Sequence, residues 1–229
     1  MKYQKGSLNI VASPIGNLGD FSSRAKEVLS QVDLIASEDT RHSRILLGQF
    51  SITTPITSYF EYSAKKTEDF LISKLMSGKN IAIITDAGTP TVSDPGARLV
   101  ARARKEGIEV IPIPGASAAI AALSVSGMPT QPFHFWGFFP PTKSKRFRIY
   151  KQICDLDGTH CFFESKHKIT KHVEEWKEVF SDFYFMIGRE MTKQFETYHW
   201  GRAPQVLDEV MQSDLRGEFT VVLSRELMD

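Results

Sequence analysis

The sequence predicts an α/β protein built from two α/β domains, and three observations support this. Strand-like and helix-like segments alternate along the whole chain, as they do where helices cover a mostly parallel sheet. The length of 229 residues, at roughly 100–200 residues per domain, allows one large or two small domains. With 41% hydrophobic and 24% charged residues the composition is globular, and no apolar run reaches the roughly 18 residues of a membrane span.

The first half of the chain is expected to form five strands separated by helices. Residues 8–12 are mostly apolar, which is typical of a strand buried on both faces. Ser22 is placed to cap a helix that carries Ala25, Leu29 and Val32 on one side. Further strands are predicted at 33–37, 56–59, 80–85 and 109–112, and further helices at 41–50, 63–77 and 97–105.

The second half continues the alternation after a hinge at residues 112–115. Two prolines stiffen this segment and Gly115 frees it, so we place the boundary between domains 1–114 and 115–229 there. A very apolar helix is expected first, at 116–126, and residues 138–146 are expected to form an exposed loop. Later strands are predicted at 133–136, 160–163, 183–187, 195–200 and 218–223, and helices at 146–153, 169–179 and 204–211.

Charge and cysteine content argue against three classes of protein: a strongly basic nucleic-acid-binding domain, a disulfide-linked protein and a structural zinc protein. The 28 basic and 27 acidic residues leave a net charge of +1, whereas a nucleic-acid-binding domain is usually strongly basic. The densest basic run carries Lys143, Lys145 and Arg146; it could contact a phosphate backbone or lie in solvent. Cys154 and Cys161 lack the spacing of a disulfide framework or a structural zinc, so we expect reduced thiols in a cytoplasmic protein without a metal.

Three loops could hold a ligand. Residues 13–20 follow the first predicted strand and residues 85–96 the fourth, and in a parallel sheet such loops line the ligand crevice. Their glycines let the backbone approach a polar ligand, although the segment 13–20 is neither a Walker loop nor a dinucleotide fingerprint. Ordinary turns with capping aspartates explain the same residues. Residues 114–119 open a helix whose N–H groups suit a ligand, or are capped by Ser117.

Acids stand beside bases at three predicted strand ends. Asp39 and Arg41 follow the second strand, Glu164 ends the strand near residue 163, and Glu190 and Lys193 follow the strand near residue 187. Such groups orient a polar substrate, or they form a local ion pair at a helix cap, and the spacing leaves both open. A Ser-His-Asp triad is unsupported because no Gly-x-Ser-x-Gly elbow occurs.

Taken in order, nine short segments resemble the bacterial 16S ribosomal RNA cytidine 2′-O-methyltransferase family, within the tetrapyrrole methylase superfamily. The resemblance runs from about residue 8 to residue 223. The segments are VASPIGNLGD at 11–20, EDTRH at 38–42, SYFE at 58–61, DAGTP at 86–90, SDPG at 93–96, PIPGASA at 112–118, FES at 163–165, REMTK at 189–193 and GEF at 217–219.

The resemblance implies a homodimeric enzyme of two α/β/α domains that binds S-adenosylmethionine in an interdomain cleft and methylates a cytidine ribose hydroxyl of 16S ribosomal RNA in the small subunit. The implied cofactor contacts are Pro14, Ala87, Gly88, Thr89, Val92, Ser117, Ala118 and Phe163. The residues expected to contact the RNA are Asn17, Arg41, Lys143, Lys145 and Arg146. The candidates for removing the hydroxyl proton are Asp39, Glu164, Glu190 and Lys193.

The sequence departs from the family pattern in three places. The family's Pro-His-Arg reads Lys-His-Lys at residues 166–168, which replaces a planar guanidinium suited to phosphate. Pro140 and Pro141 stand where the family has more basic residues, and we expect a short form that lacks the usual C-terminal helical region. A methylase of a tetrapyrrole or other small molecule, and a non-catalytic cofactor-binding module, remain alternatives.

Overall fold

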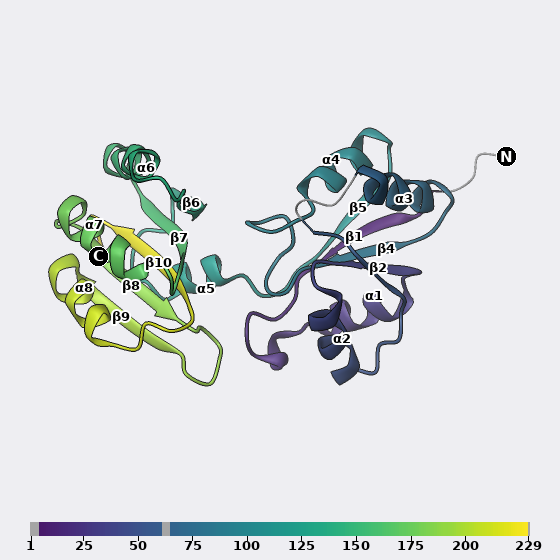
Figure 1. The fold of residues 1–229 in the computed structure, drawn as a ribbon, viewed down its shortest axis with the longest axis horizontal. Coiled ribbons are helices and arrows are strands. Elements are labelled where there is room, and N and C mark those ends of the chain that lie inside the picture. Colours follow the sequence, from purple (N-terminus) through teal and green to yellow (C-terminus); the bar gives the residue numbers. More distant parts are fainter. Residues whose placement is uncertain (1–4, 61–64, 229) are drawn as a thin grey trace. The chain divides into compact units, whose positions relative to one another are not determined.

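The computed structural model describes residues 5–60 and 65–228 (Figure 1). The chain divides into two compact units, Met1–Ser117 and Ala118–Asp229, and each unit has a five-stranded sheet of its own. The division falls just after the predicted hinge at residues 112–115. The roles assigned to the two domains stay a prediction.

Unit 1 contains a parallel sheet, as the alternation of strands and helices predicts. The strand order is β3-β2-β4-β1-β5, and each pair of neighbours runs parallel. The central strand β4 is buried at every residue, which explains its continuous apolar sequence. The strands are β1 (Ser7–Val11), β2 (Leu34–Ser37), β3 (Ile56–Ser58), β4 (Ile81–Ile84) and β5 (Glu109–Ile113).

Helices cover both faces of the unit 1 sheet (Figure 1). The helices α1 (Ser23–Gln31) and α2 (Thr40–Gln49) pack on one face, and α3 (Lys65–Met76) and α4 (Ala97–Lys105) pack on the other. Ser22 caps α1 as predicted, because its Oγ accepts a hydrogen bond from the Ala25 N–H at 3.1 Å. A short 3-10 turn, η1 (Leu18–Asp20), precedes α1. The predicted start of the third helix at residue 63 lies outside the described residues.

Unit 2 contains a mixed sheet with the strand order β6-β7-β10-β8-β9. Only the pair β6 and β7 runs parallel among the strands the structure describes there; the other three pairs are antiparallel. The strands are β6 (Phe133–Phe138), β7 (Thr159–Ser165), β8 (Tyr184–Arg189), β9 (Thr197–Arg202) and β10 (Glu218–Ser224).

The two faces of the unit 2 sheet carry different helices (Figure 1). The larger apolar core lies against α6 (Lys143–Asp155), α7 (Ile169–Val179) and α8 (Ala203–Gln212), around the fully buried Trp176. The short helix α5 (Ala118–Ser124) packs on the opposite face, against Cys161, Met186 and Val222. Within the described residues, none of the helices is long and apolar enough to cross a membrane.

The prediction of an exposed loop at residues 138–146 is wrong in part. Phe139 is buried against Tyr150 and Phe162, and α6 already begins at Lys143. The basic residues of this stretch therefore belong to the first turns of a helix. A helix with one face on a core must bury some of its residues, and Arg146 is one of them.

Candidate active site

The carboxyl ends of β4, β1 and β5 meet at one edge of the unit 1 sheet, because these three strands are neighbours and parallel. Two backbone hydrogen bonds join the loop after β1 to the loop after β4. The Ser13 N–H donates to the Gly88 oxygen at 2.8 Å, and the Gly88 N–H donates to the Ser13 oxygen at 3.1 Å. The two glycine-containing loops that the sequence singles out, at 13–20 and 85–96, are therefore hydrogen-bonded to each other.

The loop after β4 is held in shape by its own hydrogen bonds. Thr85 Oγ1 donates to Asp94 Oδ2 at 3.3 Å, and the Thr91 N–H donates to the Pro95 oxygen at 3.2 Å. Gly88 has a φ of 77°, in the left-handed region that favours glycine, and Thr91 takes the same region at 79°. Such backbone is held only where its surroundings fix it, and it concentrates at ligand-binding sites.

The segment after β5 completes this edge of the sheet. Thr89 Oγ1 donates to the Ala116 oxygen at 3.2 Å, which ties the loop after β4 to that segment. Gly115 lies so close to β1 that a Cβ there would stand 2.9 Å from the Cβ of Ala12. Glycine is needed at this position because the two backbones approach within the space of a side chain.

One buried polar atom at this edge has no partner among the residues the structure describes. The Oγ of Ser13 is buried and accepts or donates no hydrogen bond there. A buried hydroxyl without a partner is unusual and calls for a ligand or an ordered water. Sequence reasoning missed Ser13 as a site residue; its place directly before Pro14, in the loop already singled out, was the available signal.

The expected cofactor residues fall into two groups. Those near the Ser13–Gly88 bridge lie in unit 1 at the carboxyl edge of the sheet; they are Pro14, Ala87, Gly88, Thr89, Val92 and Ser117. Ala118 and Phe163 belong to unit 2, where Phe163 stacks edge-on with Phe135 on the α5 face of the sheet. The interdomain cleft implied by the resemblance stays a prediction.

Asp39 follows β2, at the same edge of the unit 1 sheet. Its Oδ1 accepts a hydrogen bond from the Arg41 N–H at 2.8 Å, so it caps α2, and its Oδ2 lies 2.8 Å from Arg41 Nη2. The hydrogen bonds from Arg41 hold the pKa of Asp39 well below its usual range. Asp39 is therefore a carboxylate at neutral pH, beside an Arg41 side chain that is largely exposed.

Glu164 does not face a ligand site shared with Phe163. The two residues are consecutive on β7, so their side chains point to opposite faces of the sheet. Glu164 is 2% exposed; it pairs with Nδ1 of His172 on α7 and accepts from the Ser165 N–H at 2.7 Å. The expectation that Glu164 lines the site as a base is wrong, because its carboxylate is enclosed on the α7 side.

Glu190 and Lys193 form an ion pair at the end of β8. Lys193 Nζ lies 3.0 Å from Glu190 Oε1 and 3.0 Å from Glu218 Oε2. Burial lowers the pKa of Lys193, but the hydrogen bonds to Glu218 and Glu190 outweigh it and hold that pKa above its ordinary value. A lysine base requires the opposite shift, so the raised pKa does not favour Lys193 as a base, and its role in removing a proton stays a prediction.

The basic run on α6 divides between surface and interior. Lys143 and Lys145 are exposed, which leaves them accessible to a phosphate backbone. Arg146 is 1% exposed, and its Nη2 and Nε lie 2.6 and 2.9 Å from the carboxylate oxygens of Glu175. Burial raises the pKa of Glu175, but the hydrogen bonds from Arg146 outweigh it and lower that pKa. The expected RNA contact of Arg146 is wrong, because its guanidinium is used inside unit 2.

The expected RNA contacts of unit 1 lie at its surface. Asn17 is exposed, and its side chain accepts from the Gly19 N–H at 2.9 Å at the start of η1. Arg41 presents its guanidinium on the first turn of α2, as described above. Within residues 5–60 and 65–228, no cluster of three or more His, Cys, Asp or Glu side chains could hold a metal ion.

Fold and site together define a two-unit α/β protein in which the loops after β1 and β4 are joined at the carboxyl edge of a parallel sheet. The family model of the Tetrapyrrole (Corrin/Porphyrin) Methylases matches residues 7–206. The chain belongs to this family, and it is a methyltransferase.

The comparisons with curated proteins cover most of the chain. It is 40% identical over 219 residues to Ribosomal RNA small subunit methyltransferase I of Halalkalibacterium halodurans, covering 96% of this chain and 76% of that protein. It is 46% identical over 193 residues to the protein of the same name from Haemophilus influenzae, covering 84% of this chain and 68% of the relative.

Solved structures share the fold at low sequence identity. Diphthine synthase is similar with a TM-score of 0.76 at 16% identity, covering 97% of this chain and 92% of that one. Cobalt precorrin-4 methyltransferase, a cobalamin biosynthetic enzyme, is similar with a TM-score of 0.68 at 16% identity, covering 95% and 94%. At these identities the likeness shows the fold alone.

Membership in a methyltransferase family implies S-adenosylmethionine as the methyl donor. The residues present fit such a group in three respects. Gly88 leaves backbone without a side chain, the loop that contains Ala87 and Val92 is partly exposed, and the buried Ser13 Oγ offers an unused hydrogen-bonding group.

Proposed function

We propose that this chain transfers a methyl group from S-adenosylmethionine to the 2′-hydroxyl of a cytidine in 16S ribosomal RNA. The observation that carries the proposal is the likeness, over 96% of the chain, to a protein named Ribosomal RNA small subunit methyltransferase I. The cytidine and the 2′-oxygen are what the resemblance of the nine ordered segments to the cytidine 2′-O-methyltransferase family implies. We propose that the loops at the carboxyl edge of unit 1 contain the residues that bind the cofactor.

The chemistry requires orientation more than a strong base. When bound, S-adenosylmethionine supplies an electrophilic methyl carbon. The chain itself would hold the ribose hydroxyl close to that carbon, and orientation of this kind contributes on the order of 7–11 kcal/mol in well-oriented cases. The loops after β1 and β4 would hold the cofactor, and a group of this chain would accept the proton that the ribose hydroxyl gives up.

Asp39 is the proposed acceptor of that proton. Each carboxylate oxygen has two lone-pair positions, so Asp39 can accept from a hydroxyl while it still accepts from Arg41. With its lowered pKa it is a weak base, so it orients the hydroxyl first and takes the proton only as the oxygen loses electron density. Arg41 is then placed to contact a neighbouring phosphate, with Lys143 and Lys145 as further RNA contacts.

The proposed substrate also indicates where in the cell the enzyme works and with which partners. A ribosomal substrate fits a cytoplasmic enzyme, and the two thiols, Cys154 and Cys161, are both free. We include a homodimer and the small ribosomal subunit as partners in the proposal, since the family resemblance implies both.

The test is incubation of the full chain with methyl-labelled S-adenosylmethionine and small ribosomal subunits that lack the modification. Label is expected on a single cytidine ribose, mapped by nuclease digestion and mass spectrometry. Label on a base, or none with active subunits and bound cofactor, would overturn the proposal. Label on a tetrapyrrole offered in parallel would favour a small-molecule methylase instead.

A further inference from the structure

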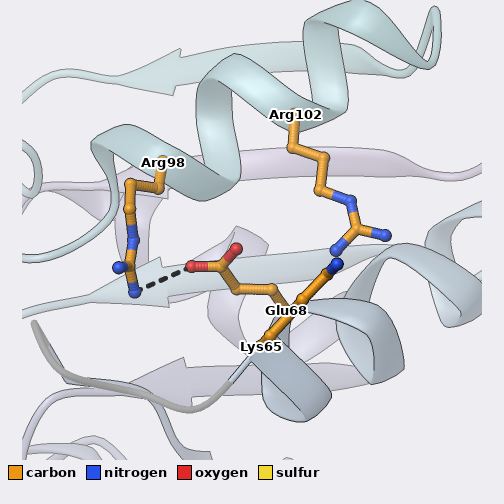
Figure 2. Close-up of a pocket in the computed structure, with 4 residues that line it drawn as sticks. All are labelled: Lys65, Glu68, Arg98 and Arg102. Atoms are coloured by element: carbon orange, nitrogen blue, oxygen red, sulfur yellow. Dashed lines mark ion pairs between the residues drawn. The ribbon is translucent and has the colours of Figure 1, made fainter.

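Unit 1 carries a surface pocket away from the Ser13–Gly88 bridge. It has a volume of about 520 Å3 and is lined by Lys65 and Glu68 of α3 and by Arg98 and Arg102 of α4 (Figure 2). Arg98 and Arg102 are four residues apart, so they share one face of α4. Three of the four lining side chains are cations.

Two ion pairs between the helices organise the pocket. Arg98 Nη2 lies 2.9 Å from Glu68 Oε1, and Arg102 Nη1 lies 2.5 Å from Asp69 Oδ1. The Tyr59 hydroxyl donates to Glu68 Oε1 at 3.4 Å. Burial, with Glu68 nearby, raises the pKa of Tyr59 to about 12, so it stays a neutral donor.

The pocket carries more positive than negative charge. Each of the two carboxylates faces one arginine, and the ammonium group of Lys65 adds a third cation. Figure 2 shows the side chains of Lys65 and Arg102 pointing toward one another from the two helices. Like charges that converge repel each other, and an anion between them removes the repulsion and accepts hydrogen bonds from both.

We propose that this pocket binds a backbone phosphodiester of the RNA substrate, with Lys65 and Arg102 as its ligands; this rests on the proposed function. In a parallel sheet the helices begin at the edge where the strands end, so α3 and α4 start at the edge that carries the cofactor loops. A phosphate there lies on the side of unit 1 from which a ribose must approach. The volume accommodates a nucleotide-sized group.

The exposure of the two arginines favours a phosphate-binding pocket over a cluster of ion pairs that only joins the two helices. The side chain of Arg98 is 58% exposed and that of Arg102 32% exposed, whereas Glu68 is 12% exposed. The more buried Glu68 carboxylate thus holds the Arg98 side chain in place, while the Arg98 guanidinium stays accessible to a ligand. Lys65 is not needed to join α3 to α4, because both interhelical ion pairs come from other residues.

The test measures the Kd of the full chain for unmodified small ribosomal subunits between 50 and about 200 mM salt. Lys65→Gln is expected to raise that Kd about tenfold, the size of one lost charged hydrogen bond. The slope of log K against log salt should fall by about 0.7–0.9 for one lost phosphate contact. Lys105→Gln, which removes the same charge at the far end of α4, is the matched control and should leave both quantities at wild-type values.

The outcomes separate two failures. If the wild-type chain methylates the subunits and Lys65→Gln behaves as Lys105→Gln does, the pocket proposal is overturned while the proposed function stands. If the wild type binds no RNA, the proposed function fails first. Titration with inorganic phosphate distinguishes the source of the anion: phosphate binding that Lys65→Gln abolishes, with unchanged RNA binding, assigns the pocket to a free anion and also overturns the proposal.

Discussion

The carboxylate of Glu190 lies directly over the backbone of Gly217, where a Cβ would stand 2.5 Å from Glu190 Oε1. The same oxygen accepts from the Glu218 N–H at 2.9 Å and from Lys193 at 3.0 Å. Glu190 itself has a φ of 50°, in the left-handed region. The segment after β8 and the start of β10 thus hold each other in place, so these charged residues stabilise unit 2.

The Glu190 pair predicts a pH-dependent stability. Burial raises the pKa of Glu190, but hydrogen bonds from Glu218 and Lys193 outweigh it and lower that pKa. A lowered pKa contributes stability above the ordinary value of 4.5 and loses it as the pH falls through the folded value. We expect Glu190→Gln to lower the free energy of unfolding by about 1 kcal/mol at pH 7, measured by urea denaturation.

The difference between wild type and Glu190→Gln should shrink as the pH is taken below 4.5. Lys193 has a raised pKa, so its share of the stability is lost only as the pH rises past 10.5. Glu174→Gln, which removes the 3.3 Å partner of Lys177 on α7, is the surface control. A difference that stays constant down to pH 3 would contradict the assigned role of Glu190.

The proposed role of Asp39 predicts a loss of turnover without a loss of folding. Asn also caps helices, so Asp39→Asn keeps the start of α2 and removes only the charge. We expect kcat to fall at least about 100-fold, the lower range for loss of a proton acceptor, with the Kd for S-adenosylmethionine unchanged. Single-turnover methyl transfer to small ribosomal subunits measures the first quantity, and calorimetry the second.

Asp33→Asn is the matched control for Asp39. Asp33 precedes β2 at the opposite edge of the sheet, and its pKa is also lowered, chiefly by Lys79 at 2.8 Å. Its replacement should leave turnover at the wild-type level. Equal losses in the two variants would mean that the charge acts through stability, and unchanged turnover in Asp39→Asn would remove Asp39 from the mechanism.

Gly88 offers a test of the cofactor loops. Alanine has room there, since the nearest atom to its Cβ is Ile15 Cγ2 at 3.7 Å, but a φ of 77° costs a side chain about 1–3 kcal/mol. The loop is therefore expected to shift in Gly88→Ala, raising the Kd for S-adenosylmethionine about tenfold for each 1.4 kcal/mol. Calorimetric titration measures this change.

Gly48→Ala is the control, because Gly48 lies within α2 and has nothing within 4 Å of its Cβ position. It should bind the cofactor as wild type does and gain about 0.5–1 kcal/mol of stability from the helix-favouring residue. Wild-type cofactor affinity in Gly88→Ala would place the ligand elsewhere.

Residue patterns predict the elements of this chain better than the fate of its charged side chains. Short apolar runs that alternate with longer helical patterns predict the parallel sheet of unit 1, since such alternation is typical of helices that cover a parallel sheet. Strand direction in unit 2 is not predictable this way, because an apolar run is the same read either way. Phe163 and Glu164 are consecutive in a strand, so alternation alone predicts that their side chains point to opposite faces of the sheet. The expectation that both line one site does not take this alternation into account.

Arg146 lies in both the loop expected at 138–146 and the helix expected at 146–153. Arg146, Tyr150 and Ile153 recur at helical spacing and share the buried face of α6. That spacing indicates a buried Arg146, whereas the charge of the run suggested a surface. The pocket between α3 and α4 depends on contacts between helices that are distant in sequence, which local patterns do not contain.

The buried Arg146–Glu175 pair supplies the last prediction. Arg146→Met leaves Glu175 enclosed without its partner, and breaking a buried pair in this way costs about 3–5 kcal/mol. The free energy of unfolding from urea titration should fall by that amount, and the double variant Arg146→Met with Glu175→Leu should regain most of it. Lys145→Met, one residue away on the exposed face, should change stability by less than about 0.5 kcal/mol. A stable Arg146→Met that binds the RNA more weakly would instead restore Arg146 as a phosphate contact.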